Sequence, residues 1–272
     1  MKTFGDTQRS TCPVCGSVHL EALWRIPFSR LEKDLQVHGA YFNMVPLLDA
    51  ASTVYCYSIC MSCESIFLNP YDGGARAAYR ESNFHADAAA RKDTARLQGY
   101  QNQYDAWIKP WLQPWSSLSV LDAGCGAGEY LFCALRDRPA GFAKLIGAEL
   151  SRHSVAAVNT MAPAGSGICA VQADLDTPGA LDGFSAANFI ILSEVFEHLE
   201  HPTIAMKNLV GAMLPGSRMF FTAQCPGGQL PVRPAEPIYT SAKGLEALLA
   251  ELGLKTLIMK IEAGRWKTVV EK

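Results

Sequence analysis

The stretch Val120–Leu131 reads VLDAGCGAGEYL and decides the fold of this chain of 272 residues. A short apolar run ends at Asp122, and glycines follow at positions 124, 126 and 128. Glycines after a strand let the backbone approach a ligand closely, because they carry no side chain and readily adopt positive φ angles. We therefore expect a buried strand, a ligand-binding loop and a helix, in this order.

From residue 118 onward, predicted strands and helices alternate. Such alternation predicts a mostly parallel sheet with helices on both faces. Two final segments, 254–261 and 265–272, flank a Glu-Ala-Gly turn and predict a hairpin that adds one antiparallel strand. The other predicted strands are 118–123, 144–150, 167–175, 187–195 and 217–224, and the predicted helices are 129–138, 152–162, 203–214 and 241–254.

The glycine spacing does not fit the two common phosphate-binding loops. A dinucleotide fingerprint needs its third glycine at position 129, which is Glu129, and the Gly-Lys-Ser/Thr ending of a P-loop is also absent. Asp122 before the loop and Glu129 after it would repel a phosphate. The loop therefore suits a cationic nucleoside without phosphates.

The motifs in 118–272 resemble, in order, those of class I S-adenosylmethionine (SAM) methyltransferases. LDAGCGAGEY (121–130) is similar to the first motif, GAELS (147–151) to the end of the second strand, QADL (172–175) to the third motif and ILSEVFEHLEHP (191–202) to the fourth. The resemblance implies an α/β fold, a Rossmann-like, doubly wound sheet of seven strands that is mostly parallel with one antiparallel strand.

The resemblance also implies roles for single residues. Glu149 would bind both ribose hydroxyls, and Asp174 would meet the adenine amino group; charged acceptors make the stronger hydrogen bonds. The structural alternatives are that Asp122 caps the following turn, Glu149 is a solvated strand end and Asp174 caps a short turn. The expected cofactor-binding residues are Asp122, Ala123, Gly124, Cys125, Gly126, Glu149, Leu150, Asp174, Leu175 and Ser193.

Methyl transfer is an in-line displacement, which an enzyme assists mainly by aligning the reactants and excluding water. A base helps when the acceptor is a hydroxyl or an acidic C–H. The candidates are His198, Tyr239 and His85, with Glu194 or Glu236 behind them. In the resembling family, the histidine at position 198 often shapes the pocket without taking part in chemistry. Its structural alternative is a ring held by a neighbouring carboxylate.

Two C-x-x-C pairs, Cys12/Cys15 and Cys60/Cys63, precede the sheet. Each pair suits one edge of a tetrahedral site, and four thiolates make a closed structural zinc site without catalytic function. Cys56 lies close in the sequence and is an alternative ligand. A disulfide or a redox C-x-x-C is the other alternative, but neither a secretory signal nor a thioredoxin-like unit surrounds these cysteines.

The cysteine region resembles the N-terminal zinc domain of bacterial methyltransferases that act on nucleotide-linked deoxysugars. Sugar C-methyltransferases of that family carry a further C-terminal domain and a histidine in the loop that corresponds to 234–239. We expect neither here, so the resemblance implies a related methyltransferase for a sugar or natural-product intermediate. The matching residues are Cys12, Cys15, Cys60, Cys63, Phe67, Asn69, Pro70 and Tyr79.

Composition divides the chain into three expected parts. Residues 1–74 form the zinc-binding region, 75–117 a helical lid and 118–272 the methyltransferase domain. The lid is rich in Ala, Arg and Gln, and its apolar residues recur at steps of three and four, which predicts either an acceptor-facing surface or plain core packing. These residues are Leu97, Tyr100, Tyr104, Trp107, Ile108 and Trp111.

Charge and hydropathy narrow the function further. The net charge is -2 and no Lys/Arg-rich block occurs, so nothing favours a nucleic-acid partner. The sequence offers neither a membrane span nor a basic-then-apolar signal, and we expect a cytoplasmic protein with reduced cysteines. The expected function is methyl transfer from SAM to a small-molecule acceptor. The alternatives are an RNA or protein methyltransferase that uses the zinc knuckles for recognition, and a non-catalytic SAM-fold scaffold.

Overall fold

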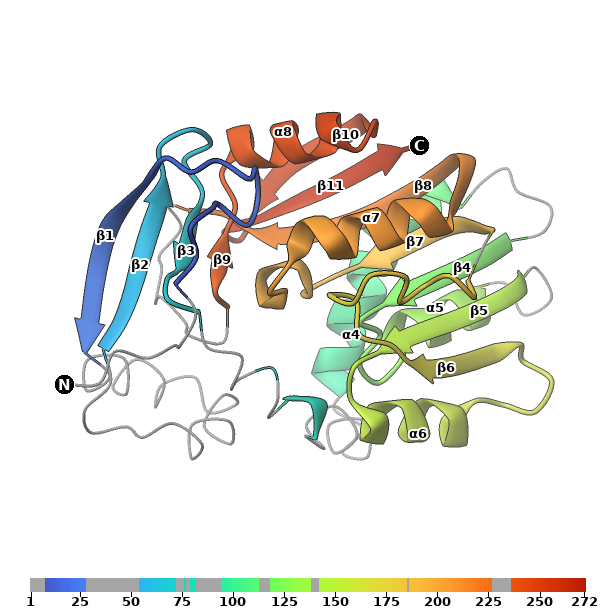
Figure 1. Ribbon diagram of the computed structural model, residues 1–272. Helices are drawn as coiled ribbons and strands as arrows, with labels where there is room; N and C mark the ends of the chain where they lie inside the picture. The colour runs from blue at the N-terminus through green and yellow to red at the C-terminus, as the bar shows by residue number, and fades with distance from the viewer. Residues whose placement is uncertain are drawn as a thin grey trace.

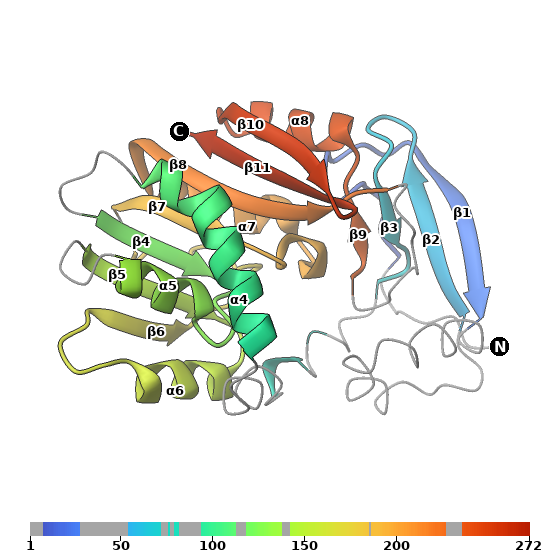
Figure 2. The same ribbon diagram turned by 180° about the vertical axis from the view of Figure 1, so that it is seen from behind.

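The computed structural model describes residues 8–27, 54–71, 76, 79–81, 94–112, 118–137, 142–184, 186–226 and 236–272. These residues form two sheets. One has seven strands in the order β10-β11-β8-β7-β4-β5-β6, and the other has four in the order β1-β2-β3-β9. In Figures 1 and 2 the four-stranded sheet stands beside the end of β8. Among the described residues, no helix has the length and apolar character needed to cross a bilayer.

The seven-stranded sheet confirms the predicted fold. Each pairing among β6, β5, β4, β7 and β8 is parallel, whereas β11 runs antiparallel to both β8 and β10. This is the mostly parallel sheet with one antiparallel strand that the motif order implies. The strands are β4 (Leu118–Ala123), β5 (Phe142–Glu149), β6 (Ile168–Gln172), β7 (Ala187–Leu192), β8 (Met213–Gln224), β10 (Lys255–Glu262) and β11 (Arg265–Glu271).

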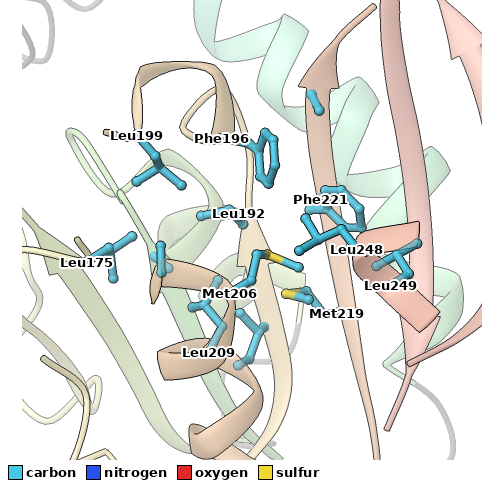
Figure 3. Close-up of a cluster of buried hydrophobic side chains, with 14 of the residues drawn as sticks. Leu175, Leu192, Phe196, Leu199, Met206, Leu209, Met219, Phe221, Leu248 and Leu249 are labelled. Atoms are coloured by element: carbon cyan, nitrogen blue, oxygen red, sulfur yellow. The ribbon is translucent and has the colours of Figure 1, made fainter. Parts of the chain in front are cut away.

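Strand residues alternate between two apolar clusters, one on each face of the sheet. Phe189 and Ile191 belong to the cluster under α5 (Glu129–Asp137) and α6 (Arg152–Met161), while Ile190 and Leu192 belong to the other. Figure 3 shows the second cluster, in which strand side chains face α7 (Pro202–Ala212) and α8 (Ala242–Glu251). The labelled residues are Leu175, Leu192, Phe196, Leu199, Met206, Leu209, Met219, Phe221, Leu248 and Leu249.

One strand begins earlier than predicted. The sequence predicts a Pro-Gly turn before a strand at 217–224, yet β8 already begins at Met213. Gly216 keeps the positive φ of a turn residue, at 76°, and the pairing with β7 shifts register beyond Ala187. The turn is therefore absorbed as an irregularity at the start of the strand, because the neighbouring strand continues the hydrogen bonding.

The four-stranded sheet links the cysteine region to the rest of the chain. β1 (Leu20–Pro27), β2 (Val54–Cys60) and β3 (Ile66–Leu68) come from the N-terminal part, but β9 (Ile238–Tyr239) follows β8 in sequence. β3 pairs with β9 in antiparallel register, and Thr240 N donates to Gln224 O at 2.8 Å. The division of the chain at residues 74 and 117 stays a prediction. β9 belongs to the third predicted part in sequence, yet it pairs with a strand of the first part.

The predicted lid helix is found over part of its length. α4 (Thr94–Gln103) continues into a π-helical turn (Tyr104–Ile108) and a 3₁₀ turn (Lys109–Trp111). Tyr104, Trp107 and Ile108 are buried, and the Trp107 ring lies 6.0 Å from that of Phe220 on β8. Leu97 is 48% exposed, so the first turn of the predicted apolar face remains at the surface.

Candidate functional site

The glycine loop lies between β4 and α5 and is fixed to the neighbouring strand. Gly124 N donates to Ala148 O at 2.6 Å, and both Gly124 and Gly126 have positive φ, at 75° and 54°. A Cβ atom on Gly124 would collide with the Val195 side chain. The loop therefore needs glycine for its backbone angles and for its close approach to the segment after β7.

Asp122 ends β4 with an oxygen that lacks a partner. The residue is 2% exposed, and its Oδ2 accepts no hydrogen bond within the described chain. Burial raises the pKa of Asp122, and the nearby charges of Glu129 and Glu149 raise it further. A buried acceptor without a donor beside bare backbone suits a ligand that brings a donor or a positive charge.

Glu149 joins the end of β5 to the glycine loop. Its Oε2 accepts from Gly126 N at 2.9 Å and its Oε1 accepts from Ser151 N at 2.9 Å. With 2% exposure it is no solvated strand end, so that structural alternative is wrong. Burial raises the pKa of Glu149, while the hydrogen bonds from the backbone and from the Tyr79 hydroxyl oppose this rise.

Asp174 both caps a turn and holds two arginines. Its Oδ1 accepts from Asp176 N at 3.2 Å, as the structural alternative expects. Arg76 also pairs with Oδ1, and Arg80 Nη2 lies 2.7 Å from Oδ2. Glu200 completes the group through Arg76 Nη1 at 3.4 Å. Sequence reasoning did not assign Arg76 or Arg80, because 98 residues separate Arg76 from Asp174 and no local pattern connects them.

The end of β7 faces the aromatic side of α4 and α5. Ser193 is 9% exposed, and its Oγ lies 3.2 Å from Tyr130 Oη and 3.4 Å from Gln103 Nε2. The Tyr130 ring packs edge-on against Tyr100 at 5.0 Å. Glu129 pairs with Arg96, which offsets part of the burial that raises the pKa of this carboxyl. The helix before the sheet therefore contributes polar and aromatic groups to the loop region.

Three glutamates gather beyond β7 and β8. Glu194 pairs with Arg265 at 2.7 Å, whereas Glu197 is fully buried and its Oε2 has no partner among the described residues. Burial raises the pKa of Glu197 well above its usual value, and the charges of Glu194 and Glu236 raise it further. Glu236 is 3% exposed.

The contact between Glu197 and the Gln224 amide also bears on the protonation of Glu197. One end of the Gln224 amide lies 3.2 Å from both Nε and Nη2 of Arg265, so this end carries the oxygen. The same end lies 3.4 Å from Glu197 Oε1. Two oxygens at this distance make a hydrogen bond only if one carries a hydrogen. A proton on Glu197 would suit this contact, in line with the raised pKa of its carboxyl group.

The structure brings two of the three catalytic candidates onto adjoining elements. His198 is half-buried in the 3₁₀ turn Phe196–His198, which packs against β8 and β9. Tyr239 is buried on β9. His85 lies outside the described residues. The sequence marked Glu197, beside His198 in the fourth motif, but gave it no role.

The four paired cysteines converge at the edge of the four-stranded sheet. The Sγ atoms of Cys12, Cys15, Cys60 and Cys63 all lie within 4.8 Å of one another, and all nine cysteines are free. Cys56 lies outside this group, on β2.

The donor chemistry of this group fits a metal with soft ligands. Hydrogen bonding with Cys12 and Ser65 lowers the pKa of Cys63, which favours a thiolate within the group. In each pair the residue after the second cysteine has a positive φ, at 72° for Gly16 and 64° for Glu64. Both pairs thus form the same tight turn, and four sulfur ligands match the tetrahedral preference of zinc.

Comparison with known proteins agrees with the fold. A family model described as methyltransferase domain matches residues 85–257. No curated protein matches the chain. The solved structure described as PigF with SAH is similar with a TM-score of 0.53 and 20% identity, over 72% of this chain and 61% of PigF.

Two further solved structures match most of their own length. One comes from the complex between the Haloferax volcanii Trm112 methyltransferase activator and the putative methyltransferase, with a TM-score of 0.51 and 17% identity, over 70% of this chain and 98% of that chain. The other is the S-adenosylmethionine-dependent methyltransferase from Mesorhizobium loti, with a TM-score of 0.50 and 16% identity, over 65% and 100%. At these identities the likeness concerns the fold alone.

The raised pKa of Glu197 makes a testable prediction about pH. Its folded pKa lies above its unfolded pKa of about 4.3, so ionisation opposes folding as the pH rises above that value. Glu197→Gln cannot ionise and should gain stability over the wild type between pH 5 and 8, by about 2–4 °C in Tm if the gain is about 1 kcal/mol. Thermal unfolding across this range measures the difference, with the exposed Glu251→Gln as a control that stays level. If the Tm of the variant instead falls relative to that of the wild type as the pH rises, Glu197 is ionised and paired.

Proposed function

The chain belongs to the methyltransferase-domain family, and on this premise we propose that it transfers a methyl group from SAM to a small-molecule acceptor such as a sugar or natural-product intermediate. The junction between the glycine loop and Glu149 carries the proposal. There, bare backbone, a carboxylate and the unpartnered oxygen of Asp122 meet at the carboxyl ends of β4 and β5. Ligands of open α/β sheets bind at this edge.

The residues at this junction suit a cationic nucleoside. SAM, when bound, supplies a methyl group on a positively charged sulfur. Gly124 and Gly126 would leave room beside the backbone, Glu149 would accept hydrogen bonds from the ribose diol, and Asp174 would accept one from the adenine amino group. A positive charge nearby favours the ionised form of an acid, so it would offset the burial of Asp122. Ala123, Cys125, Leu150, Leu175 and Ser193 would line the same site.

The acceptor would lie beyond β7 and β8, where His198 and Tyr239 are on adjoining elements. Either side chain would take the proton if the nucleophile is a hydroxyl or an acidic C–H. The aromatic side of α4 and the four-stranded sheet would help to exclude water from this region. Alignment and exclusion of water are the main contributions that a protein makes to methyl transfer.

We also propose that the cysteine group binds a structural zinc ion. Such an ion would fix both C-x-x-C turns at once. The second turn is tied to the methyltransferase sheet, because Ser241 at the start of α8 donates to Cys63 O and its backbone N lies 3.3 Å from Ser65 Oγ. Zinc would therefore hold β2 and β3 in place beside the acceptor region.

Glu149→Ala tests the cofactor assignment. The variant loses a charged acceptor for the ribose and also the bond that holds Gly126, so we expect SAM affinity to fall by on the order of 100-fold. Isothermal titration with SAM measures it, and Glu251→Ala on the exposed face of α8 is the matched control. Unchanged affinity in Glu149→Ala would overturn the ribose assignment. A wild type that binds SAM but methylates none of a broad acceptor panel would favour the scaffold alternative.

Metal analysis tests the zinc proposal. The purified chain should contain about one zinc ion, and Cys60→Ser should lower both the zinc content and the Tm, since structural zinc contributes folding energy. Cys169→Ser, at an exposed cysteine outside the group, should change neither. A folded, metal-free wild type with the same Tm after chelation would contradict the proposal.

A further inference from the structure

Three residues before the sheet make contact with both acids assigned to the nucleoside. We call Arg76, Tyr79 and Arg80 the strap residues. Tyr79 donates a hydrogen bond to Glu149, while Arg76 and Arg80 pair with Asp174. The strap residues therefore belong to the cofactor site, although they lie in none of the sheet motifs.

Glu149 is covered as well as bonded. Backbone N–H groups of Gly126 and Ser151 each take one of its oxygens, yet these bonds alone leave other lone pairs free. Its 2% exposure shows that those lone pairs do not face water. The Tyr79 hydroxyl occupies a remaining position, and this phenol also lies close to Cys125 of the glycine loop and to Tyr100 of α4. A ribose diol reaches Glu149 only after Tyr79 leaves.

Asp174 is engaged at both oxygens by guanidinium N–H groups. Arg80 Nη2 lies 2.7 Å from Oδ2, and Arg76 Nη2 holds Oδ1. The two arginines differ in the contacts that they would keep after separating from Asp174. The Arg80 side chain is 47% exposed and returns readily to water, whereas Arg76 keeps Asp176 Oδ2 at 3.3 Å and Glu200 Oε2 at 3.4 Å. Arg76 can therefore release Asp174 without becoming an unpaired charge.

The hydrogen-bond donors that contact Glu149 and Asp174 are of the same chemical kinds as the donors of the proposed ligand. A hydroxyl faces the acid assigned to the ribose hydroxyls, and N–H₂ groups face the acid assigned to the adenine amino group. We infer that the strap residues hold the cofactor site closed by standing in for the nucleoside, so that SAM binds by displacing Tyr79 from Glu149 and the arginines from Asp174. This inference rests on the proposed function.

Displacement has a thermodynamic consequence that direct contact lacks. When a site is closed most of the time, its apparent affinity equals the affinity of the open site multiplied by the fraction of molecules that are open. Removing a strap contact that competes with the nucleoside raises that fraction and tightens binding. Removing a side chain that instead binds the nucleoside weakens binding.

Titration calorimetry with S-adenosylhomocysteine distinguishes these cases. Tyr79→Phe and Arg80→Met each remove one competing donor and keep most of the side-chain bulk, and each should bind the probe about two- to tenfold more tightly than the wild type. Arg152→Met is the matched control, since Arg152 forms an exposed pair with Glu81 at 2.8 Å and contacts neither acid through a described hydrogen bond. Equal or weaker binding by both strap variants would overturn the inference, as would an equal gain in the control.

A rate measurement gives a second test. If opening precedes binding, the observed association rate levels off at high probe concentration, and Arg80→Met should raise this plateau. Arg80 is half exposed, so this variant serves even if Tyr79→Phe does not fold. A wild type that fails to bind the probe would remove the proposed function itself. A wild type that binds, with strap variants that behave like it, would remove only the strap inference.

Discussion

The bond between the Glu149 carboxylate and Gly126 N is the interaction on which the site depends. It fixes the loop after β4 to the end of β5, and it does so with a charged acceptor, which is stronger than a neutral one. The glycines can adopt the required backbone angles without this bond, but the loop would then be free to adopt other conformations as well. Burial of Glu149 makes this bond necessary, because a carboxylate with 2% exposure needs several donors to remain ionised.

Other buried carboxyl groups also need hydrogen-bond donors, a counter-ion or a proton, and the structure provides for them in different ways. Glu129 has Arg96 as a counter-ion, and Glu149 has backbone donors. Glu197 has a pKa that burial and the charges of Glu194 and Glu236 raise, which favours its neutral form. Asp122 Oδ2 accepts no hydrogen bond from the residues that the structure describes. Of these acids, Asp122 is the one whose environment a cationic ligand would improve most, and it lies directly before the glycine loop.

Local patterns predicted the sheet well because its central strands contain short, mostly apolar runs, such as LSVL in β4 and FIIL in β7, that end in a polar or glycine-rich turn. Asp122, Gly124 and Gly126 share one loop, so a single stretch of sequence brings them together. The strap residues could not be predicted in this way, since Arg76 meets Asp174 across 98 residues. β9 escaped prediction for the same reason: a strand of two residues has no periodicity of its own, and pairing with β3 alone defines it. Long-range contacts therefore limited the prediction of the site more than that of the sheet.

The pairing of β3 with β9 also links the cysteine region to the segment that follows β8. Phe67 is fully buried opposite Ile238, and Ser241 two residues beyond β9 both starts α8 and bonds Cys63 O. The second C-x-x-C turn is therefore bonded to the start of α8 and lies beside the strand that carries Tyr239. Because β9 with Tyr239 packs against the turn of His198, a bound metal would influence the proposed acceptor region through the position of these elements. Such an indirect influence is what a closed four-thiolate site permits, since it leaves no open position for a reactant.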